Sequence, residues 1–354
     1  MELPVMPPVK PMLAKSQPAI PEGMSYEPKF DGFRCIAFRD GDQIELGSRN
    51  ERPLTRYFPE VAEELRRQLP RRCVVDGEIV VAIDGELDFW ALQQRIHPAA
   101  SRVAMLSQKT PAWFIAFDLL ALDDLSFLEA PFSERRRALE AALDVVSSPV
   151  YVAPITDDIA LARRWFERFE GAGLDGIVAK AHDLRYVPNR RLWVKVKHER
   201  TADCVVAGFR WYRGDRVVGS LLLGLYDEEG GLHPIGVIGA FSALRRRQLL
   251  DEIAPYRLED GESHPWTTNP EWQQGAGQPG SRWNSDKDLS FEPLRPVLVV
   301  EIAYDWMEGD RLRHTGQFRR WRPDRDPESC TFDQLDRPTS FDVRDVLAPP
   351  EGGS

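Results

Sequence analysis

The stretch Glu27-Pro28-Lys29-Phe30-Asp31-Gly32-Phe33-Arg34 decides how the rest of the chain is interpreted. Its apolar and charged residues alternate as in a half-buried strand, so Lys29 and Asp31 are predicted to project from the same face. Gly32 allows another group to approach the backbone closely. Two interpretations of Lys29 remain open from this stretch alone. It is either a solvated lysine at the edge of a sheet or a nucleophilic amine that attacks phosphorus.

The composition fits two ordinary domains. The chain has 354 residues, of which 42% are hydrophobic, enough for two separate cores. No apolar run reaches the length of a membrane span, and residues 1–13 lack the basic-then-apolar order of a signal peptide. The four cysteines form no C-x-x-C pair, which predicts reduced core residues in a cytoplasmic protein and argues against zinc sites or disulfides.

The net charge of −10 argues against a protein that binds nucleic acid over its whole surface. The arginines nevertheless cluster locally, although arginine runs on helices are usually solvated faces. These clusters are Arg135–Arg137, Arg163–Arg164, Arg190–Arg191, Arg245–Arg247 and Arg319–Arg320. The acidic total therefore predicts DNA binding that is strongly salt-sensitive and confined to one surface.

The chain divides into two parts of different character. Residues 1–200 read as a sheet-rich body with covering helices, which is an α+β pattern because strands and helices do not alternate strictly. Residues 201–335 contain closely spaced strands with one helix between them, which fits a small five-stranded β-barrel of the OB type. A polar loop over about 259–293 interrupts this second part, and residues 336–354 are predicted to form a mobile acidic tail.

The sequence also predicts where several helices begin. Val61, Leu65 and Leu69 lie on one stripe of a predicted helix over residues 60–69. Asp88 and Asp157 are the expected caps of helices that run through Arg95 and Phe169, and Ser242 is the expected cap of a helix through about Ile253.

Three further clusters favour the nucleophilic interpretation of Lys29. Asp76-Gly77-Glu78 places two carboxylates inside an apolar run, where acids need partners or a metal. Asp175 and Lys180 stand at opposite ends of a short apolar strand. In Trp193-Val-Lys195-Val-Lys197 the alternation places both lysines on one face, where they could neutralise a phosphate.

Nucleotidyl transfer needs this set of groups. Holding an ordinary lysine neutral at pH 7 costs roughly 4–5 kcal/mol, because its pKa is near ~10.4. Lys195, Lys197 and a divalent metal are expected to lower the pKa of Lys29 by like-charge repulsion. Carboxylates from three segments are expected to hold Mg²⁺ or Mn²⁺ directly or through water, namely Asp31, Glu78 and Asp175.

In order along the chain, these clusters resemble the motifs of ATP-dependent DNA ligases. The matching segments are Lys29-x-Asp31-Gly32-x-Arg34, Ser48-Arg49, Asp76-Gly77-Glu78, Phe117-Asp118, Asp175-Gly176-x-x-x-Lys180, Trp193-x-Lys195-x-Lys197 and Arg322-x-Asp324-Arg325. The resemblance covers about residues 11–335. The compact layout, the start at Pro11 and the segment Arg320–Arg325 are most similar to the bacterial ligase C group.

The resemblance implies a nucleotidyltransferase (ATP-grasp-like adenylation) domain followed by an OB-fold domain, and it implies a role for each motif. Lys29 would carry a covalent AMP. The base would be bound by Glu27 and Phe117, and the ribose and incoming 5′-phosphate by Arg34, Arg49 and Glu78. Asp31 and Asp175 would hold the metal, and the AMP phosphate would be bound by Lys180, Lys195 and Lys197. Arg322, Asp324 and Arg325 would orient pyrophosphate in the first step.

Two departures from the family pattern concern the site. Asp175 stands where the family usually has Glu, so the acid is one methylene shorter. Arg325 stands where the last motif more often has Lys, which keeps the charge but changes its geometry.

These implications favour an ATP-dependent DNA ligase that seals nicks between a 5′-phosphate and a 3′-OH. Its expected roles are DNA repair and recombination. The short segment before Lys29 predicts ATP, and not NAD, as the donor. The expected partners are nicked double-stranded DNA and repair proteins. The protein is expected to be a monomer that acts at the nucleoid and not at a membrane. The alternatives are an RNA ligase, a capping-type nucleotidyltransferase or a non-catalytic OB-fold binder of nucleic acid.

Overall fold

The computed structural model describes residues 1–97, 99–212, 215–259, 261–268, 290–335 and 340–348. The chain forms two compact units. Unit 1 comprises Met1–Lys197 with Pro338–Ser354, and unit 2 comprises His198–Arg337. Among the described residues, no helix is both long enough and apolar enough to span a membrane.

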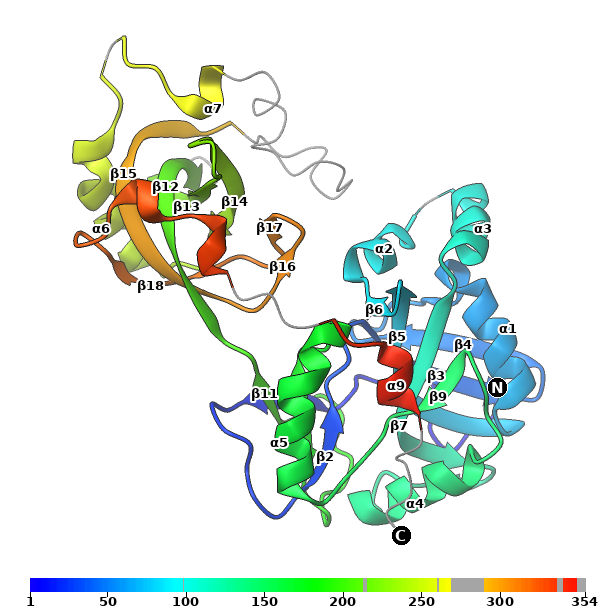
Figure 1. The fold of residues 1–354 in the computed structure, drawn as a ribbon. Helices are drawn as coiled ribbons and strands as arrows, with labels where there is room; N and C mark the ends of the chain where they lie inside the picture. The colour runs from blue at the N-terminus through cyan, green and yellow to red at the C-terminus, as the bar shows by residue number, and fades with distance from the viewer. Residues whose placement is uncertain (98, 213–214, 260, 269–289, 336–339, 349–354) are drawn as a thin grey trace. The chain divides into compact units, whose positions relative to one another are not determined.

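Unit 1 is built on a seven-stranded, mostly antiparallel sheet (Figure 1). Across the sheet the main strands are β4 (Gln43–Ser48), β3 (Phe33–Asp40), β5 (Arg72–Ile83), β7 (Ala112–Leu122) and β8 (Leu125–Ser126). Two shorter strands join it, β6 (Glu86–Leu87) beside β5 and β9 (Val150–Val152) beside β7. Apolar residues of β5 point alternately into two different cores, so the strand is apolar along most of its length.

Helices cover one face of this sheet. They are α1 (Pro59–Gln68), α2 (Phe89–Gln94), α3 (Ala100–Lys109) and α4 (Phe132–Ala142), with a short 3₁₀ turn at Thr55–Tyr57. The predicted stripe on α1 is confirmed, because Val61 and Leu65 are buried. Asp88 caps α2 as predicted, accepting a hydrogen bond from the backbone of Ala91 at 2.7 Å.

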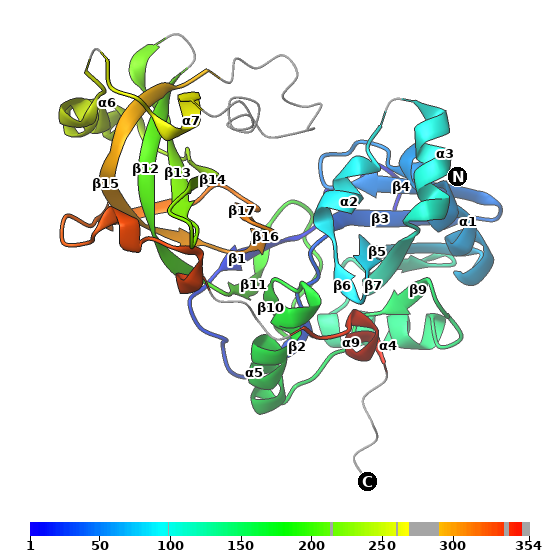
Figure 2. The same cartoon turned by 45° about the horizontal axis from the view of Figure 1, so that its top comes forward.

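A second, four-stranded sheet lies on the other side of the core. Its order is β1 (Leu13–Ser16), β11 (Arg191–Lys197), β10 (Gly176–Lys180) and β2 (Ser25–Pro28) (Figure 2). Helix α5 (Ile159–Arg168) packs on β2 and β10, and its cap is Asp158, not the predicted Asp157. A 3₁₀ turn, Phe169–Ala172, follows α5. Because Lys29 directly follows β2 and Phe33 begins β3, residues 29–32 connect the two sheets.

Residues 340–348 do not belong to a mobile tail, as was predicted for residues 336–354. Helix α9 (Val343–Leu347) packs against unit 1, and Val343 and Val346 are buried in the core between the two sheets. The backbone N–H of Val343 also donates to the carbonyl of Gly85 at 2.7 Å. The apolar residues at helical spacing outweigh the acidic composition on which the prediction was based. Residues 336–339 and 349–354 lie outside the described part of the chain.

Unit 2 is a five-stranded antiparallel sheet around a single core. Its order is β14 (Leu232–Ile238), β13 (Asp215–Tyr226), β12 (Arg200–Tyr212), β15 (Glu292–Tyr304) and β18 (Gln317–Trp321). A small pair, β16 (Met307–Glu308) and β17 (Arg311–Leu312), and 3₁₀ turns at Ala254–Tyr256, Pro327–Ser329 and Phe332–Gln334 complete it.

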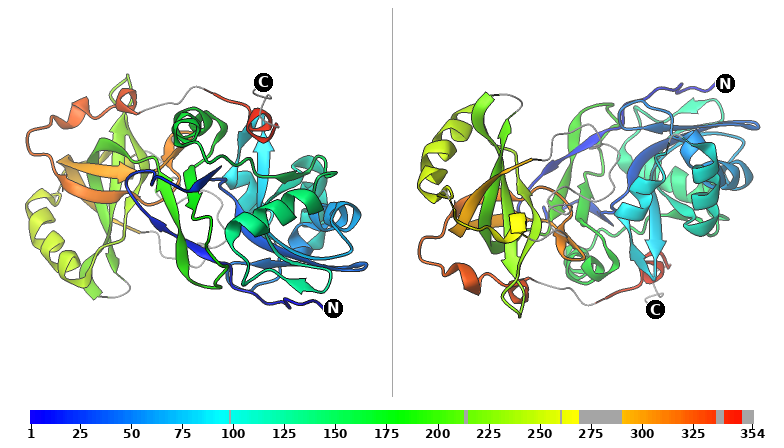
Figure 3. Two further views of the ribbon diagram at one scale, coloured as in Figure 1. Left: turned by 90° about the horizontal axis from the view of Figure 1, so that it is seen from below. Right: turned by 90° about the horizontal axis from the view of Figure 1, so that it is seen from above.

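Two helices in the described part of unit 2 pack on this sheet. Helix α6 (Ala243–Ile253) lies against β13 (Figure 3). Ser242 caps it as predicted. Helix α7 (Pro265–Thr268) places Trp266 in the core, where its indole N–H donates to the carbonyl of Leu232 at 2.7 Å. Most of the loop predicted over 259–293 lies outside the described residues.

Candidate active site

The backbone brings Lys29 and Asp175 together although 146 positions separate them in the sequence. The N–H of Lys29 donates to the carbonyl of Gly176 at 2.8 Å, and the N–H of Asp175 donates to the carbonyl of Lys29 at 2.9 Å. These two bonds extend the β2–β10 pairing by one step beyond the strands. The lysine is therefore fixed by sheet pairing and not by a flexible loop.

Asp175 is the centre of a cluster of lysines. The Nζ of Lys29 lies 2.6 Å from Asp175 Oδ2, and the Nζ of Lys197 lies 2.8 Å from the same oxygen. Lys195 is two residues before Lys197 on β11, as the alternation predicted. It makes no hydrogen bond or ion pair with a described residue, so its charge is balanced only at longer range.

Gly176 permits this approach. Its φ of +133° lies in a region that other residues rarely adopt, and a Cβ there would lie 2.0 Å from the carbonyl oxygen of Val196. The close contact of β10 with β11 brings Asp175 within reach of Lys197.

The pKa values follow from these contacts. Burial raises the pKa of Asp175, but Lys29 and Lys197 outweigh it and hold the pKa well below its ordinary value. Burial lowers the pKa of Lys29, whereas Asp175, Asp31 and Glu78 raise it and prevail. In the protein without nucleotide and metal the pKa of Lys29 is therefore raised and not lowered as expected, because three carboxylates outweigh the effect of burial. The pKa of Lys195 is lowered, by burial and then by Lys29 and Lys197.

Glu78 faces the same connection from β5. It accepts a hydrogen bond from the backbone N–H of Gly32 at 3.2 Å. A Cβ on Gly32 would lie 2.2 Å from the carbonyl oxygen of Ile79, so only glycine lets this segment lie so close to β5. Burial raises the pKa of Glu78 to about 7, against the lowering effect of Arg34 and Lys29.

The predicted metal ligands gather around one amine. Asp31, Glu78 and Asp175 each raise the pKa of Lys29, which places all three in its electrostatic surroundings. Their carboxylate oxygens are the donor type that Mg²⁺ or Mn²⁺ requires. Among the described residues, however, no three acidic, His or Cys side chains form a ready metal-binding group. In this structure the Asp175 carboxylate is balanced by the ammonium groups of Lys29 and Lys197.

Arg34 is held by a carboxylate and by two aromatic rings. Its guanidinium forms a two-point ion pair with Asp76, at 2.6 Å for each bond. It also lies over the rings of Phe117 and Trp193, at 4.5 and 4.8 Å from their centres. Tyr186 donates its hydroxyl hydrogen to Asp76 at 2.6 Å. The structure thus shows Arg34 in contact with Asp76 and with two aromatic rings. Its predicted contact with ribose stays a prediction.

Lys180 is not placed as predicted for a residue that binds the AMP phosphate. Its side chain is 1% exposed, and its Nζ lies 2.6 Å from Glu27 Oε2. The ammonium group also donates to the carbonyl of Phe117 at 3.1 Å. The physical reason is that a buried carboxylate and aromatic rings surround the Lys180 ammonium group and stabilise its positive charge inside the protein.

Glu27 and Arg49 have opposite environments. The Glu27 carboxylate is 4% exposed and lies between Lys180 and Arg136, the latter at 3.4 Å. Arg49 directly follows β4, is exposed, and makes no hydrogen bond or ion pair with a described residue. The structure therefore does not bring Arg49 into the cluster around Asp175.

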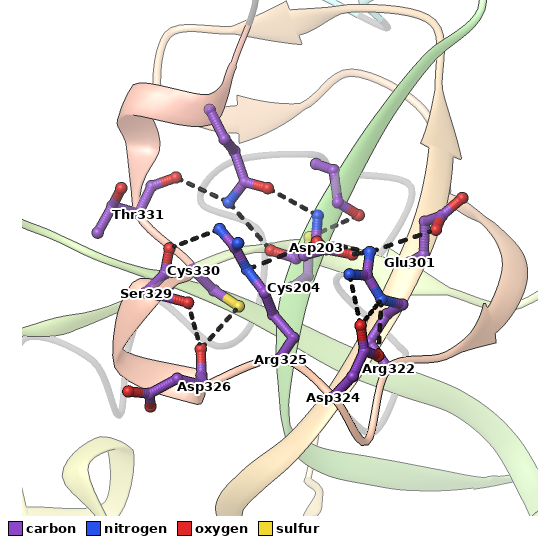
Figure 4. A network of polar contacts seen from close by, with 12 residues as sticks. Asp203, Cys204, Glu301, Arg322, Asp324, Arg325, Asp326, Ser329, Cys330 and Thr331 are labelled. Atoms are coloured by element: carbon purple, nitrogen blue, oxygen red, sulfur yellow. Dashed lines mark hydrogen bonds and ion pairs between the residues drawn. The ribbon is translucent and has the colours of Figure 1, made fainter.

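Three predicted residues lie in unit 2 and form a network of their own (Figure 4). Arg322 contacts Asp203 at 3.0 Å and Asp324 at 2.9 Å, with Glu301 at 3.6 Å. Arg325 lies 3.6 Å from Asp203 and donates to the carbonyl of Ser329 at 3.2 Å. The hydrogen bonds that Arg322 donates to Asp324 lower the pKa of the Asp324 carboxyl group to about 2.

Sequence reasoning missed two arginines of α4 that support the site. Arg135 and Asp118 are both fully buried and form a two-point ion pair at 2.7 and 2.9 Å. Arg136 contacts Glu27 and donates to the carbonyl of Ala153 at 2.6 Å. The signal was the run Arg135–Arg137, which resembles a solvated helix face in sequence.

Comparison with known proteins identifies the family. Residues 11–197 match the ATP dependent DNA ligase domain, and residues 214–325 match the ATP dependent DNA ligase C terminal region. The chain is 58% identical to DNA ligase C of Mycobacterium tuberculosis, over 98% of this chain and 99% of that protein. It is 59% identical to DNA ligase C2 of Mycolicibacterium smegmatis, over 96% of this chain and 97% of that protein.

A solved structure of a Lig E DNA ligase is 15% identical, with a TM-score of 0.55 over 88% of this chain and 99% of that one. This likeness shows the fold alone. The predicted nucleotidyltransferase and OB-fold architecture and the predicted enzyme class are confirmed by the family matches. The chain is a member of the ATP-dependent DNA ligase family, of the bacterial ligase C type.

Proposed function

We propose that this ligase seals 5′-phosphate/3′-OH nicks in double-stranded DNA through a covalent AMP on Lys29. The Lys29 amine first loses a proton and attacks the α-phosphorus of ATP. A P–N bond forms, and the P–O bond to pyrophosphate breaks. AMP then passes to the 5′-phosphate, and the 3′-OH displaces it as the nick closes.

The observation that carries this proposal is the cluster of Lys29, Lys195 and Lys197 around Asp175. The amine of Lys29 is held at a fixed place by strand pairing, which is what a nucleophile in nucleotidyl transfer requires. Lys195 lacks a close carboxylate and is therefore available to an incoming phosphate. Lys197 adds a second cation on the same face of β11.

The remaining roles follow the chemistry of each side chain. We assign the base to Glu27 and Phe117. We assign the ribose and the 5′-phosphate to Arg34, Arg49 and Glu78. Asp31, Glu78 and Asp175 are assigned to Mg²⁺ or Mn²⁺, which would neutralise phosphate charge and replace the ammonium groups at Asp175. Arg322, Asp324 and Arg325 of unit 2 are assigned to the self-adenylation step, in which they orient pyrophosphate.

The biological setting of this proposal is DNA repair. Nicked DNA is the substrate, repair proteins are the proposed partners, and the enzyme is proposed to act as a monomer at the nucleoid in the cytoplasm. The relatives that support the setting are bacterial DNA ligases.

Mass spectrometry of the intact protein tests the first step. Wild type incubated with ATP should gain the mass of one AMP, and pyrophosphate should remove it. Lys29→Ala should gain nothing, while Lys15→Ala on the exposed face of β1 should behave as wild type. Incorporation from GTP in place of ATP would favour a capping-type enzyme. Sealing of nicked RNA duplexes in place of DNA would favour an RNA ligase.

A further inference from the structure

We propose that Arg136 and Lys180 are positioning residues that fix the Glu27 carboxylate toward the nucleotide base and thereby set the preference for ATP over GTP. This inference rests on the proposed function, in which Glu27 contacts the base. It adds two residues that do not touch the nucleotide and act only through Glu27.

The two cations hold different oxygens of one carboxylate. Lys180 lies 2.6 Å from Glu27 Oε2, and Arg136 lies 3.4 Å from Glu27 Oε1. The three residues come from β10, α4 and β2, and each of the three side chains is at most 8% exposed. Because each oxygen has its own cation, rotation of the carboxylate about its last bond breaks both contacts.

Lys180 connects Glu27 to a group of aromatic side chains. Its ammonium group lies 4.8 Å from the ring centres of Phe117 and Phe132 and 4.4 Å from that of Trp193. It also donates to the carbonyl of Phe117. One buried cation therefore touches both residues assigned to the base, so their relative placement depends on it.

Arg136 is itself fixed from two further sides. It donates to the carbonyl of Ala153 at 2.6 Å and pairs with Glu140 on the next turn of α4 at 2.7 Å. The preceding residue, Arg135, pairs with Asp118, which directly follows Phe117. Adjacent arginines of α4 thus anchor to both sides of the proposed base site.

The chemistry of a carboxylate held in this way favours adenine. An ionised carboxylate only accepts hydrogen bonds, and its two oxygens offer about four acceptor positions. The two cations leave positions for a further donor. Adenine presents an amino group at C6, which donates, whereas guanine presents a carbonyl oxygen there, which the carboxylate repels. A carboxylate that turns freely loses part of this discrimination.

Self-adenylation with ATP and with GTP tests the inference, read out by intact mass and by steady-state incorporation. In Arg136→Gln the KM for ATP should rise and the ATP-over-GTP preference should fall by about tenfold or more, with kcat changed much less. Arg136→Lys keeps the cation and should retain most of the preference. The control is Arg137→Gln, since Arg137 is exposed on the same helix and does not contact Glu27.

A double substitution separates positioning from a merely structural role. In the Glu27→Gln background, Arg136→Gln should produce no further change in the ATP-over-GTP preference. An unchanged preference in folded Arg136→Gln, or an equal further loss in the Glu27→Gln background, would overturn the inference. If Arg136→Gln does not fold, Lys180→Met is measured in the same way and must also lower the preference. Absence of any adduct in wild type would instead refute the proposed function.

Discussion

Lys29 and Asp175 meet side chain to side chain at 2.6 Å, and the same carboxylate oxygen accepts Lys197 at 2.8 Å. One acid thus balances two ammonium groups in the protein without nucleotide. The arrangement keeps the proposed nucleophile protonated, because Asp175, Asp31 and Glu78 raise the pKa of Lys29. In the proposed mechanism, bound nucleotide and metal would have to change this balance before the amine could attack.

Asp175→Asn should lower the rate of AMP incorporation by about 100-fold, because Lys29 and Lys197 then repel each other without a carboxylate between them. Asp175→Glu should retain at least a tenth of the wild-type rate, since the longer acid still reaches the lysines. The measurement is the time course of AMP addition by intact mass. A wild-type rate in Asp175→Asn would show that the carboxylate is dispensable.

Gly176→Ala should destabilise the protein by at least about 3 kcal/mol and abolish AMP incorporation, because its Cβ would meet the carbonyl of Val196 at 2.0 Å. Gly23→Ala is the matched control. Gly23 has a φ of +71° with no atom within 4 Å of an added Cβ, so it should cost only about 1 kcal/mol. Chemical denaturation compares the two, and similar losses would contradict the close-approach argument.

Arg322→Ala should reduce self-adenylation by about 100-fold while sparing the sealing of a nick that already carries AMP. The reason is that its proposed role concerns pyrophosphate, which takes part only in the first step. Arg320→Ala serves as the control, because Arg320 also pairs with Glu301 but is largely exposed. Equal loss in both assays would point to a structural role for the Arg322 network instead.

The stability of unit 2 should fall as pH decreases below about 6.5, through His264. The Nε2 of His264 lies 2.8 Å from the carbonyl of Ala207, and its Nδ1 accepts from Trp266, which requires the neutral ring. Burial lowers the pKa of His264, so the unfolded chain binds the proton first as pH falls. The stabilisation by neutral His264 is therefore complete above the pKa that this histidine has in the unfolded chain. It is lost as the pH falls toward the lower pKa that His264 has in the folded protein.

Thermal unfolding of the whole protein between pH 5 and 8 checks this expectation. His264→Gln should show a shallower decline of the unit 2 transition than wild type. His314→Gln, an exposed histidine in the same unit, should keep the wild-type slope. Identical slopes in wild type and His264→Gln would assign the pH dependence to other groups.

Much of the site could be predicted from the order and alternation of residues. Lys195 and Lys197 were correctly placed on one face of β11 because the side-chain period of a strand is two. The strand predicted through Lys29 and Asp31 is wrong, since β2 ends at Pro28 and β3 begins only at Phe33. The cap of α2 by Asp88 was correct because capping depends only on neighbours in sequence. Helix α9 was missed because its burial depends on a surface formed by residues far away in the chain.

The sequence by itself determined which groups are available: the lysines, the acids, the glycines that permit close backbone approach, and the order that marks the ligase family. Only the tertiary structure decided which charge meets which. Lys180 and Lys197 are each the last residue of a strand, yet one is buried against Glu27 and the other shares Asp175 with Lys29. The physical reason is that alternation fixes the face of a strand, whereas the partner of a charge depends on distances between strands that are remote in sequence.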